Sequence, residues 1–225
     1  MNITEKLTTV ANNVPLVYNA GYVKGKTENG EAYVFKNMNS LNYFFESGYN
    51  SHYTDKFKDL DFSSIYSAQY IFRNNKDVTS IVTPAFSDKL KLIHGMFMGC
   101  TALKTVDMSK DMFTARVNVV TDLFNGCTAL EKVIGTLDFS KADYASRTFQ
   151  GCSALQDIRF AENSIKISIT FADSPLLTGE SVNSIINALI NITDGVARTV
   201  TFNGAVALTD SQKATIETKG WDLVQ

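Results

Sequence analysis

The residues best suited to chemistry in this sequence are three cysteines, which could bind a metal or take part in redox reactions. Cys100, Cys127 and Cys152 are 27 and 25 residues apart, so they form no CxxC pair, and no nearby histidine completes a zinc-ligand set. An odd, sparse set of thiols also argues against a disulfide scaffold. The spacing favours three cysteines that stack in the core as small apolar side chains.

The two histidines, His52 and His94, do not lie in a sequence context typical of catalysis. Neither belongs to a nucleophile elbow or an HExxH motif, and no phosphate-binding glycine loop is present. The acidic residues are scattered, and nothing indicates the carboxylate pair that a glycosidase needs. We therefore predict no catalytic, cofactor-binding or metal-binding residues, and we do not expect an enzyme.

The cysteines belong to a repeated heptapeptide, Phe-Xaa-Gly-Cys-Thr/Ser-Ala-Leu. It begins at Phe97, Phe124 and Phe149, and weaker copies begin at Phe72 and Phe171. Three near-identical heptapeptides at a regular step indicate a repeat architecture. A still more degenerate copy starts at Phe45.

Each copy continues in phase into a short apolar, polar, apolar segment. In three of the copies the aliphatic residue after the heptapeptide is Val106, Val133 or Ile158. Two related segments follow, Val106–Lys110 and Leu137–Lys141, the second displaced by four residues with a small insertion near Gly135. Alternation of this kind predicts one half-buried strand per coil, and stacked coils would form a parallel sheet along one face.

The heptapeptide together with the Leu-Asp-Phe-Ser segment at 137–140 resembles the BspA-like leucine-rich-repeat family. The resemblance covers residues 45–178, most closely 96–160. It implies an α/β fold: a leucine-rich-repeat solenoid of about five to six coils with a parallel sheet on one face. Along the chain we expect a helical docking segment at 1–28, the solenoid at 29–177 and a small α/β cap at 178–225.

The N-terminal segment has a short heptad-like pattern. Its apolar positions are Ile3, Leu7, Val10, Val14 and Val17. Pro15 interrupts the pattern, so we predict two short helices at about 3–12 and 15–25. Two interpretations remain open: a cap that covers the first coil, and a docking or oligomerisation segment.

The C-terminal region changes its periodicity. Apolar residues at helical spacing after Thr178 predict an amphipathic helix, and the alternation at 199–202 predicts a strand. Thr209 and Gln212 form a capping box for a second helix, which ends at Lys219–Gly220, and residues 221–224 predict a last strand. These elements would cover the last coil.

Both flanks carry a second resemblance. Residues 10–15 (VANNVP), 18–22 (YNAGY) and 25–26 are similar to the N-terminal segment of structural proteins of tailed bacteriophages. The pattern from Leu208 to Trp221 resembles the ending of phage-encoded proteins with this same repeat. These resemblances imply attachment to a virion through the N-terminal segment.

An aromatic cluster occupies residues 43–72 and has two possible roles. Its rings could fill the core of the degenerate coils, which we favour, or some could be exposed for contacts with a ligand. Tyr49 and Tyr53 are the best candidates for exposed contacts.

Composition limits the classes of partner. The net charge is −2 without a basic stripe, which argues against nucleic-acid binding, and no apolar run is long enough to cross a membrane. With no signal peptide at Met1, we expect synthesis in a host cytoplasm and a final location in the virion.

We therefore predict a non-enzymatic component of a tail tip, baseplate or fibre that displays its repeat surface to a host glycan or protein. It would bind other virion proteins and form a homo-oligomer. A capsid decoration or head fibre is the first alternative, and a bacterial surface adhesin is the second.

Overall fold

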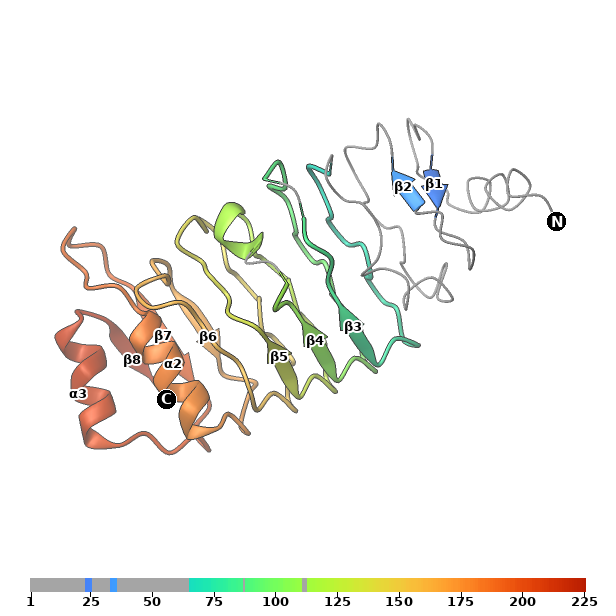
Figure 1. The fold of residues 1–225 in the computed structure, drawn as a ribbon. Coiled ribbons are helices and arrows are strands. Elements are labelled where there is room, and N and C mark those ends of the chain that lie inside the picture. The colour runs from blue at the N-terminus through green and yellow to red at the C-terminus, as the bar shows by residue number, and fades with distance from the viewer. Residues whose placement is uncertain (1–22, 26–32, 36–64, 87, 111–112) are drawn as a thin grey trace.

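Successive turns of similar shape lie side by side along most of the chain (Figure 1). The computed structural model describes residues 23–25, 33–35, 65–86, 88–110 and 113–225. Three short strands, β3 (Ser80–Val82), β4 (Thr105–Asp107) and β5 (Lys132–Ile134), form a parallel sheet in that order. Each strand belongs to a different turn, and the sheet therefore runs across the stack.

The register of this sheet agrees with the repeat in the sequence. Ile81 pairs with Val106, and Val106 pairs with Val133, so residues at the same position of the repeat lie beside one another. All three side chains point into the core, with exposed fractions of 2% or less. A bridge between Lys132 and Asp157 extends the pairing by one more turn. The predicted phase of the strands and their parallel pairing are confirmed.

One predicted strand lies elsewhere. The segment Leu137–Phe139 was expected to be the strand of its turn, but that strand is β5, and Leu137 forms only an isolated bridge to Phe160. Gly135, with a φ of +98°, turns the chain directly after β5. What the Asp-Xaa-Ser segments share is a turn: the Asp138 carboxylate accepts a hydrogen bond from the backbone N–H of Ser140.

A second ladder joins the turns on another face. Single parallel bridges connect Ser67 to Leu92, Leu92 to Val119, and Val119 to Tyr144. The short 3-10 helix η3 (Phe113–Arg116) precedes Val119 in its turn. Each of these turns is therefore tied to its neighbours at two places, once through the sheet and once through these bridges.

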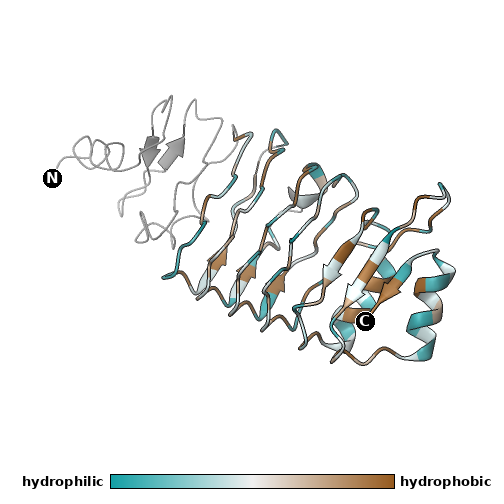
Figure 2. Cartoon of the chain, turned by 180° about the vertical axis from the view of Figure 1, so that it is seen from behind, coloured by the Kyte–Doolittle hydropathy of each residue, from teal (hydrophilic) through white to brown (hydrophobic). Residues whose placement is uncertain are grey.

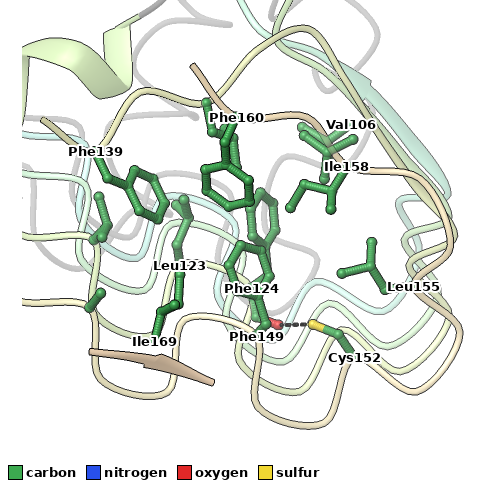
Figure 3. Packing of buried hydrophobic residues seen from close by; sticks show 14 of the residues in the cluster. Val106, Leu123, Phe124, Phe139, Phe149, Cys152, Leu155, Ile158, Phe160 and Ile169 are labelled. Atoms are coloured by element: carbon green, nitrogen blue, oxygen red, sulfur yellow. Dashed lines mark hydrogen bonds between the residues drawn. The ribbon is translucent and has the colours of Figure 1, made fainter. Parts of the chain in front are cut away.

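Stacked phenylalanine rings fill the centre of the turns (Figure 3). Phe97 and Phe124 have ring centroids 5.5 Å apart and planes within 4° of parallel, and Phe124 stacks on Phe149 at 5.8 Å. The full stack comprises Phe72, Phe97, Phe124, Phe149, Phe171 and Phe202. The weaker repeat copies at Phe72 and Phe171 therefore belong to the same core, as the sequence predicted.

The glycine of each heptapeptide has a left-handed backbone. Gly99, Gly126 and Gly151 have φ values of 73°, 76° and 72°. A Cβ on Gly126 would lie 3.5 Å from the Cα of Gly99, which is ordinary contact. Glycine is favoured at all three positions because a side chain is strained in the left-handed region, and at Gly99 a Cβ would also overlap Oδ1 of Asn74.

The C-terminal region forms a second parallel sheet with two helices. Strands β6 (Ile169–Phe171), β7 (Thr199–Phe202) and β8 (Asp222–Val224) pair in that order, and α2 (Gly179–Ala188) and α3 (Asp210–Thr218) lie between them in sequence. The predicted helix after Thr178 is α2, with Thr178 as its N-cap, and the predicted capping box of Thr209 with Gln212 is confirmed. Because β6 pairs with β7, this sheet joins residues on both sides of the expected boundary at 177. Figure 2 shows hydrophobic and hydrophilic segments interleaved along each turn, in the strands and in the connections between them.

The described part of the N-terminal region corrects one prediction. Residues 15–25 were expected to be helical, but β1 (Val23–Gly25) is a strand that pairs antiparallel with β2 (Tyr33–Phe35). The β-branched and aromatic residues of β2, Tyr-Val-Phe, favour a strand, and Val23 does so in β1. The helical segment therefore does not extend to residue 28. The proposed docking residues lie outside the described residues: Ile3, Leu7, Val10, Val14 and Val17. The same holds for Phe45, Tyr49, His52 and Tyr53.

Candidate binding surfaces

The outer side of the β3–β5 sheet is one candidate surface, here called the strand face. Side chains on either side of the buried central residue of each strand point outward, which places Thr105 beside Lys132 and Asp107 beside Ile134. The bridge from Lys132 adds Asp157 to this row. Backbone hydrogen bonds between turns hold the strands in fixed register, so these side chains start from regularly spaced positions along an extended face.

Opposite charges from neighbouring turns pair across the strand face. Lys104 lies 3.5 Å from Glu131, and Lys132 lies 3.5 Å from Asp157. Every side chain in these two pairs is at least 37% exposed. Exposed pairs contribute little to stability, about 0–1 kcal/mol each, so these groups can exchange their present partner for another at low cost.

The side chains around the second ladder form another candidate surface, here called the bridge face. Its outward residues in three successive turns are Lys91 and Leu92, Asn118 and Val119, and Asp143 and Tyr144. Leu92 and Val119 are half-buried, whereas Tyr144 is 65% exposed. An apolar row therefore crosses these turns, flanked by a polar row that has Lys91 at one end and Asp143 at the other.

A buried carboxylate lies beside the bridge face. The side chain of Asp122 is 3% exposed and accepts two hydrogen bonds from the Arg147 guanidinium, both at 2.7 Å. The amide of Asn125 donates a third at 2.7 Å, and His94 Nε2 lies 3.7 Å away. The His94 ring meets the ring of Tyr70 edge-on at 4.9 Å. These residues come from four successive turns.

The pKa of Asp122 is lowered, and two opposing effects produce this result. Burial alone would raise the pKa, but the hydrogen bonds from Arg147 and Asn125 and the charge of Arg147 outweigh it. Asp122 is therefore ionised over the physiological pH range. With its oxygens already bonded, it serves to fix neighbouring turns and is poorly placed to act as a base.

The same position of the turn is left-handed in the four copies that begin at Phe72, Phe97, Phe124 and Phe149. Tyr70, Gly95, Asp122 and Arg147, each two residues before the stacked phenylalanine, have φ values between 55° and 58°. Three of the four are not glycine, although a side chain in this conformation costs roughly 1–2 kcal/mol. The polar cluster around Asp122 compensates for part of that strain.

The three cysteines are buried hydrogen-bond donors. Cys100, Cys127 and Cys152 are free thiols with no exposed surface. The thiol of Cys152 donates to the carbonyl oxygen of Phe124 in the preceding turn, at 3.2 Å (Figure 3). Burial raises the pKa of Cys100 and Cys152 to about 12. The predicted stacking of these thiols in the core is confirmed, and such thiols are poor nucleophiles.

The sequence prediction missed both the Asp122 cluster and the bridge face. Among residues 65–86, 88–110 and 113–225, no group of three or more His, Cys, Asp or Glu side chains could hold a metal ion. His94 belongs to the Asp122 cluster. The repeat itself contained a signal for the bridge face, because Ser67, Leu92, Val119 and Tyr144 each lie five residues before a stacked phenylalanine.

Stacked parallel turns with short strands define a repeat-like mixed α/β protein. The chain belongs to the family described as "Mycoplasma protein of unknown function, DUF285", which matches residues 36–162. This family is associated with BspA-like repeat proteins. No curated protein and no solved structure matches the chain. In the part of the chain that the structure describes, no helix is long and apolar enough to cross a membrane.

Proposed function

We propose that this protein is a non-enzymatic binding protein, a leucine-rich-repeat solenoid of the BspA-like type that uses its strand face to recognise a glycan or protein on a host cell. The repeat core, with its parallel strands in equivalent positions, supports this architecture. A stack of this kind buries its apolar residues between turns and leaves a long, regular outer surface.

The observation that carries the proposal is the set of exposed charges held in register on the strand face. Lys104, Glu131, Lys132 and Asp157 occupy neighbouring positions on successive turns and form two ion pairs with one another, and the Asp157 carboxylate also accepts a hydrogen bond from Thr178. A partner with spaced polar groups could replace these weak pairs one by one. Several weak contacts along a rigid surface, repeated over many copies, would give avidity without a deep pocket.

The proposed place of action is a virion, in a tail tip, a baseplate or a fibre. This part rests on the resemblance of both flanks to phage structural proteins, with residues 1–26 as the docking segment and other virion proteins as partners. A capsid decoration or head fibre would use the same docking segment and repeat surface, but it would be attached to the capsid. The family description names mycoplasmas, which are cellular bacteria, and this favours a bacterial surface adhesin as the second candidate.

Charge reversal on the strand face tests recognition. The probes are intact cells and purified cell-wall polysaccharide of the bacterial strain that carries the gene. We expect Lys132→Glu to weaken binding of the purified protein at least tenfold without changing its melting temperature, since Lys132 is half-exposed. Lys213→Glu on α3 is the matched control and should bind like the wild type. Equal binding by both variants, or no binding by the wild type to either probe, would reject this recognition role.

Immunogold electron microscopy tests the location. Antibody against the protein should label one defined structure of phage particles, and a variant that lacks residues 1–26 should be missing from them. Label on the bacterial surface, with none on particles, would favour the adhesin instead.

A further inference from the structure

We infer that the bridge face is a self-association surface, on which two copies of this chain pack face to face with their turns running in opposite directions. The symmetry axis would lie in the interface and cross the turn that contains Val119. This inference concerns a different surface from the strand face and is independent of the recognition proposed above.

The apolar row supplies the centre of the contact. Bridges between turns place Leu92, Val119 and Tyr144 in one line, with neighbouring strands about 4.8 Å apart. Two of these side chains are half-buried and Tyr144 is 65% exposed. A straight row of apolar side chains on an ordered ladder is suited to the centre of a protein interface, where apolar and aromatic residues are enriched.

A two-fold axis of this orientation determines which residues meet. Rotation about an axis that crosses the stack reverses the order of the turns but keeps each position within a turn. Leu92 of one copy therefore lies opposite Tyr144 of the other, since these residues are one turn on either side of Val119. Val119 lies opposite its own symmetry mate.

The polar row, with Lys91 and Asp143 at its ends, is complementary under the same rotation. Lys91 and Asp143 occupy equivalent positions, because the backbone N–H of Lys91 bonds to Tyr66 and that of Asp143 bonds to Asn118 in the same way. Lys91 of each copy would face Asp143 of the other, so the interface contains two opposite-charge pairs. Asp143 is 54% exposed even though it pairs with Lys166 at 3.1 Å, and its carboxylate can accept a second partner.

The alternative symmetric arrangement lacks this complementarity. An axis along the stack would place each turn opposite itself. Lys91 and Asp143 would then remain two turns apart, or about 10 Å by the strand spacing. Charge therefore favours the antiparallel arrangement.

The size of the face indicates a weak dimer. Three turns at about 4.8 Å by five residues at about 3.3 Å give a strip of about 240 Å² per copy. A stable complex buries about 800 Å² per partner, so the contact would form at high concentration or between copies that an assembly holds together.

Disulfide trapping tests the contact even when it is weak. Val119→Cys should form a disulfide-linked dimer under mild oxidation with copper phenanthroline at least ten times faster than the control Ala214→Cys on α3. The native thiols are buried and do not compete. Equal rates for the two variants would overturn the inference and leave the bridge face free for a different protein.

Charge exchange tests the orientation. In the Val119→Cys background, Lys91→Asp alone and Asp143→Lys alone should each slow crosslinking several-fold, and the double variant should restore the rate. Melting temperatures identify any variant that is misfolded, and Lys91→Gln with Asp143→Asn then serves as the neutral pair, with an intermediate rate. If every charge variant crosslinked as fast as Val119→Cys alone, the axis would run along the stack, and the antiparallel arrangement would be wrong.

Discussion

The thiol of Cys127 lies 3.0 Å from the carbonyl oxygen of Phe97, one turn earlier, and donates a hydrogen bond to it. Cys100 bonds in the same way to Phe72 at 2.9 Å. Ser174, three residues after Phe171, occupies the equivalent position in a later turn. Its hydroxyl donates a hydrogen bond to the backbone carbonyl oxygen of Cys152 at 3.2 Å. The repeated cysteine therefore has two roles: it fills the core, and it links each turn to the one before it.

We expect the three thiols to be unreactive in the folded protein. A pKa of about 12 for Cys100 and Cys152, compared with about 9 for an unperturbed thiol, lowers the thiolate fraction at pH 8 about a thousandfold, and burial blocks the reagent as well. Titration with Ellman's reagent should detect no fast-reacting thiol in buffer and all three in denaturant. A thiol that reacts within seconds in the native protein would contradict this packing.

Glycine substitutions should separate backbone strain from steric overlap. Gly126→Ala should cost about 1–2 kcal/mol, because only its left-handed conformation is unfavourable for alanine. Gly135→Ala should cost more, since its Cβ would also lie 2.9 Å from the backbone carbonyl carbon of Met108. Gly204→Ala, with open space around it, is the control and should change little. Urea unfolding gives the free energy of unfolding of all three variants. If Gly126→Ala lost more stability than Gly135→Ala, this explanation would be wrong.

The central phenylalanine should matter far more for stability than an exposed tyrosine of similar size. Phe124 is fully buried between Phe97 and Phe149, so Phe124→Ala should destabilise the protein by about 3–5 kcal/mol. Tyr144→Ala removes a side chain that is 65% exposed and should cost less than about 1 kcal/mol in the monomer. If Phe124→Ala and Tyr144→Ala lost similar amounts of stability in thermal or urea unfolding, the phenylalanine stack would not be the main core.

The repeat made much of the fold predictable, because equivalent positions of a stack share one environment. The spacing of Phe97, Phe124 and Phe149 was sufficient to predict burial and strand phase. It was not sufficient at residues 132–139, where two segments alternate equally well. The hydrogen bonds between turns select Lys132–Ile134 there.

The candidate surfaces were harder to predict, because their residues share a position but no chemistry. Tyr70, Gly95, Asp122 and Arg147 have in common only a left-handed backbone. No local motif joins Asp122 to Arg147, since the two residues are 25 positions apart and meet only through stacking. Leu92 and Tyr144 are likewise neighbours only across turns.

The ion pair between Asp122 and Arg147 should make the free energy of unfolding depend on pH in the acidic range. Because the folded-state pKa of Asp122 is lowered, its contribution is complete above the unfolded value of about 3.9 and is lost as pH falls through the lower folded value. Asp122→Asn keeps the shape and tolerates a left-handed backbone, but it removes the charge. We expect it to cost about 1–3 kcal/mol at pH 7 and progressively less below pH 4.

Urea unfolding of the wild type and of Asp122→Asn between pH 7 and pH 2.5 measures this difference. Arg147→Lys is the matched control, because lysine keeps the positive charge but cannot form the two parallel hydrogen bonds to the carboxylate. Its stability should therefore lie between those of the wild type and Asp122→Asn at neutral pH. If the gap between the wild type and Asp122→Asn stayed constant down to pH 2.5, the carboxylate would not be ionised in this cluster, and the link between these turns would have to depend on shape alone.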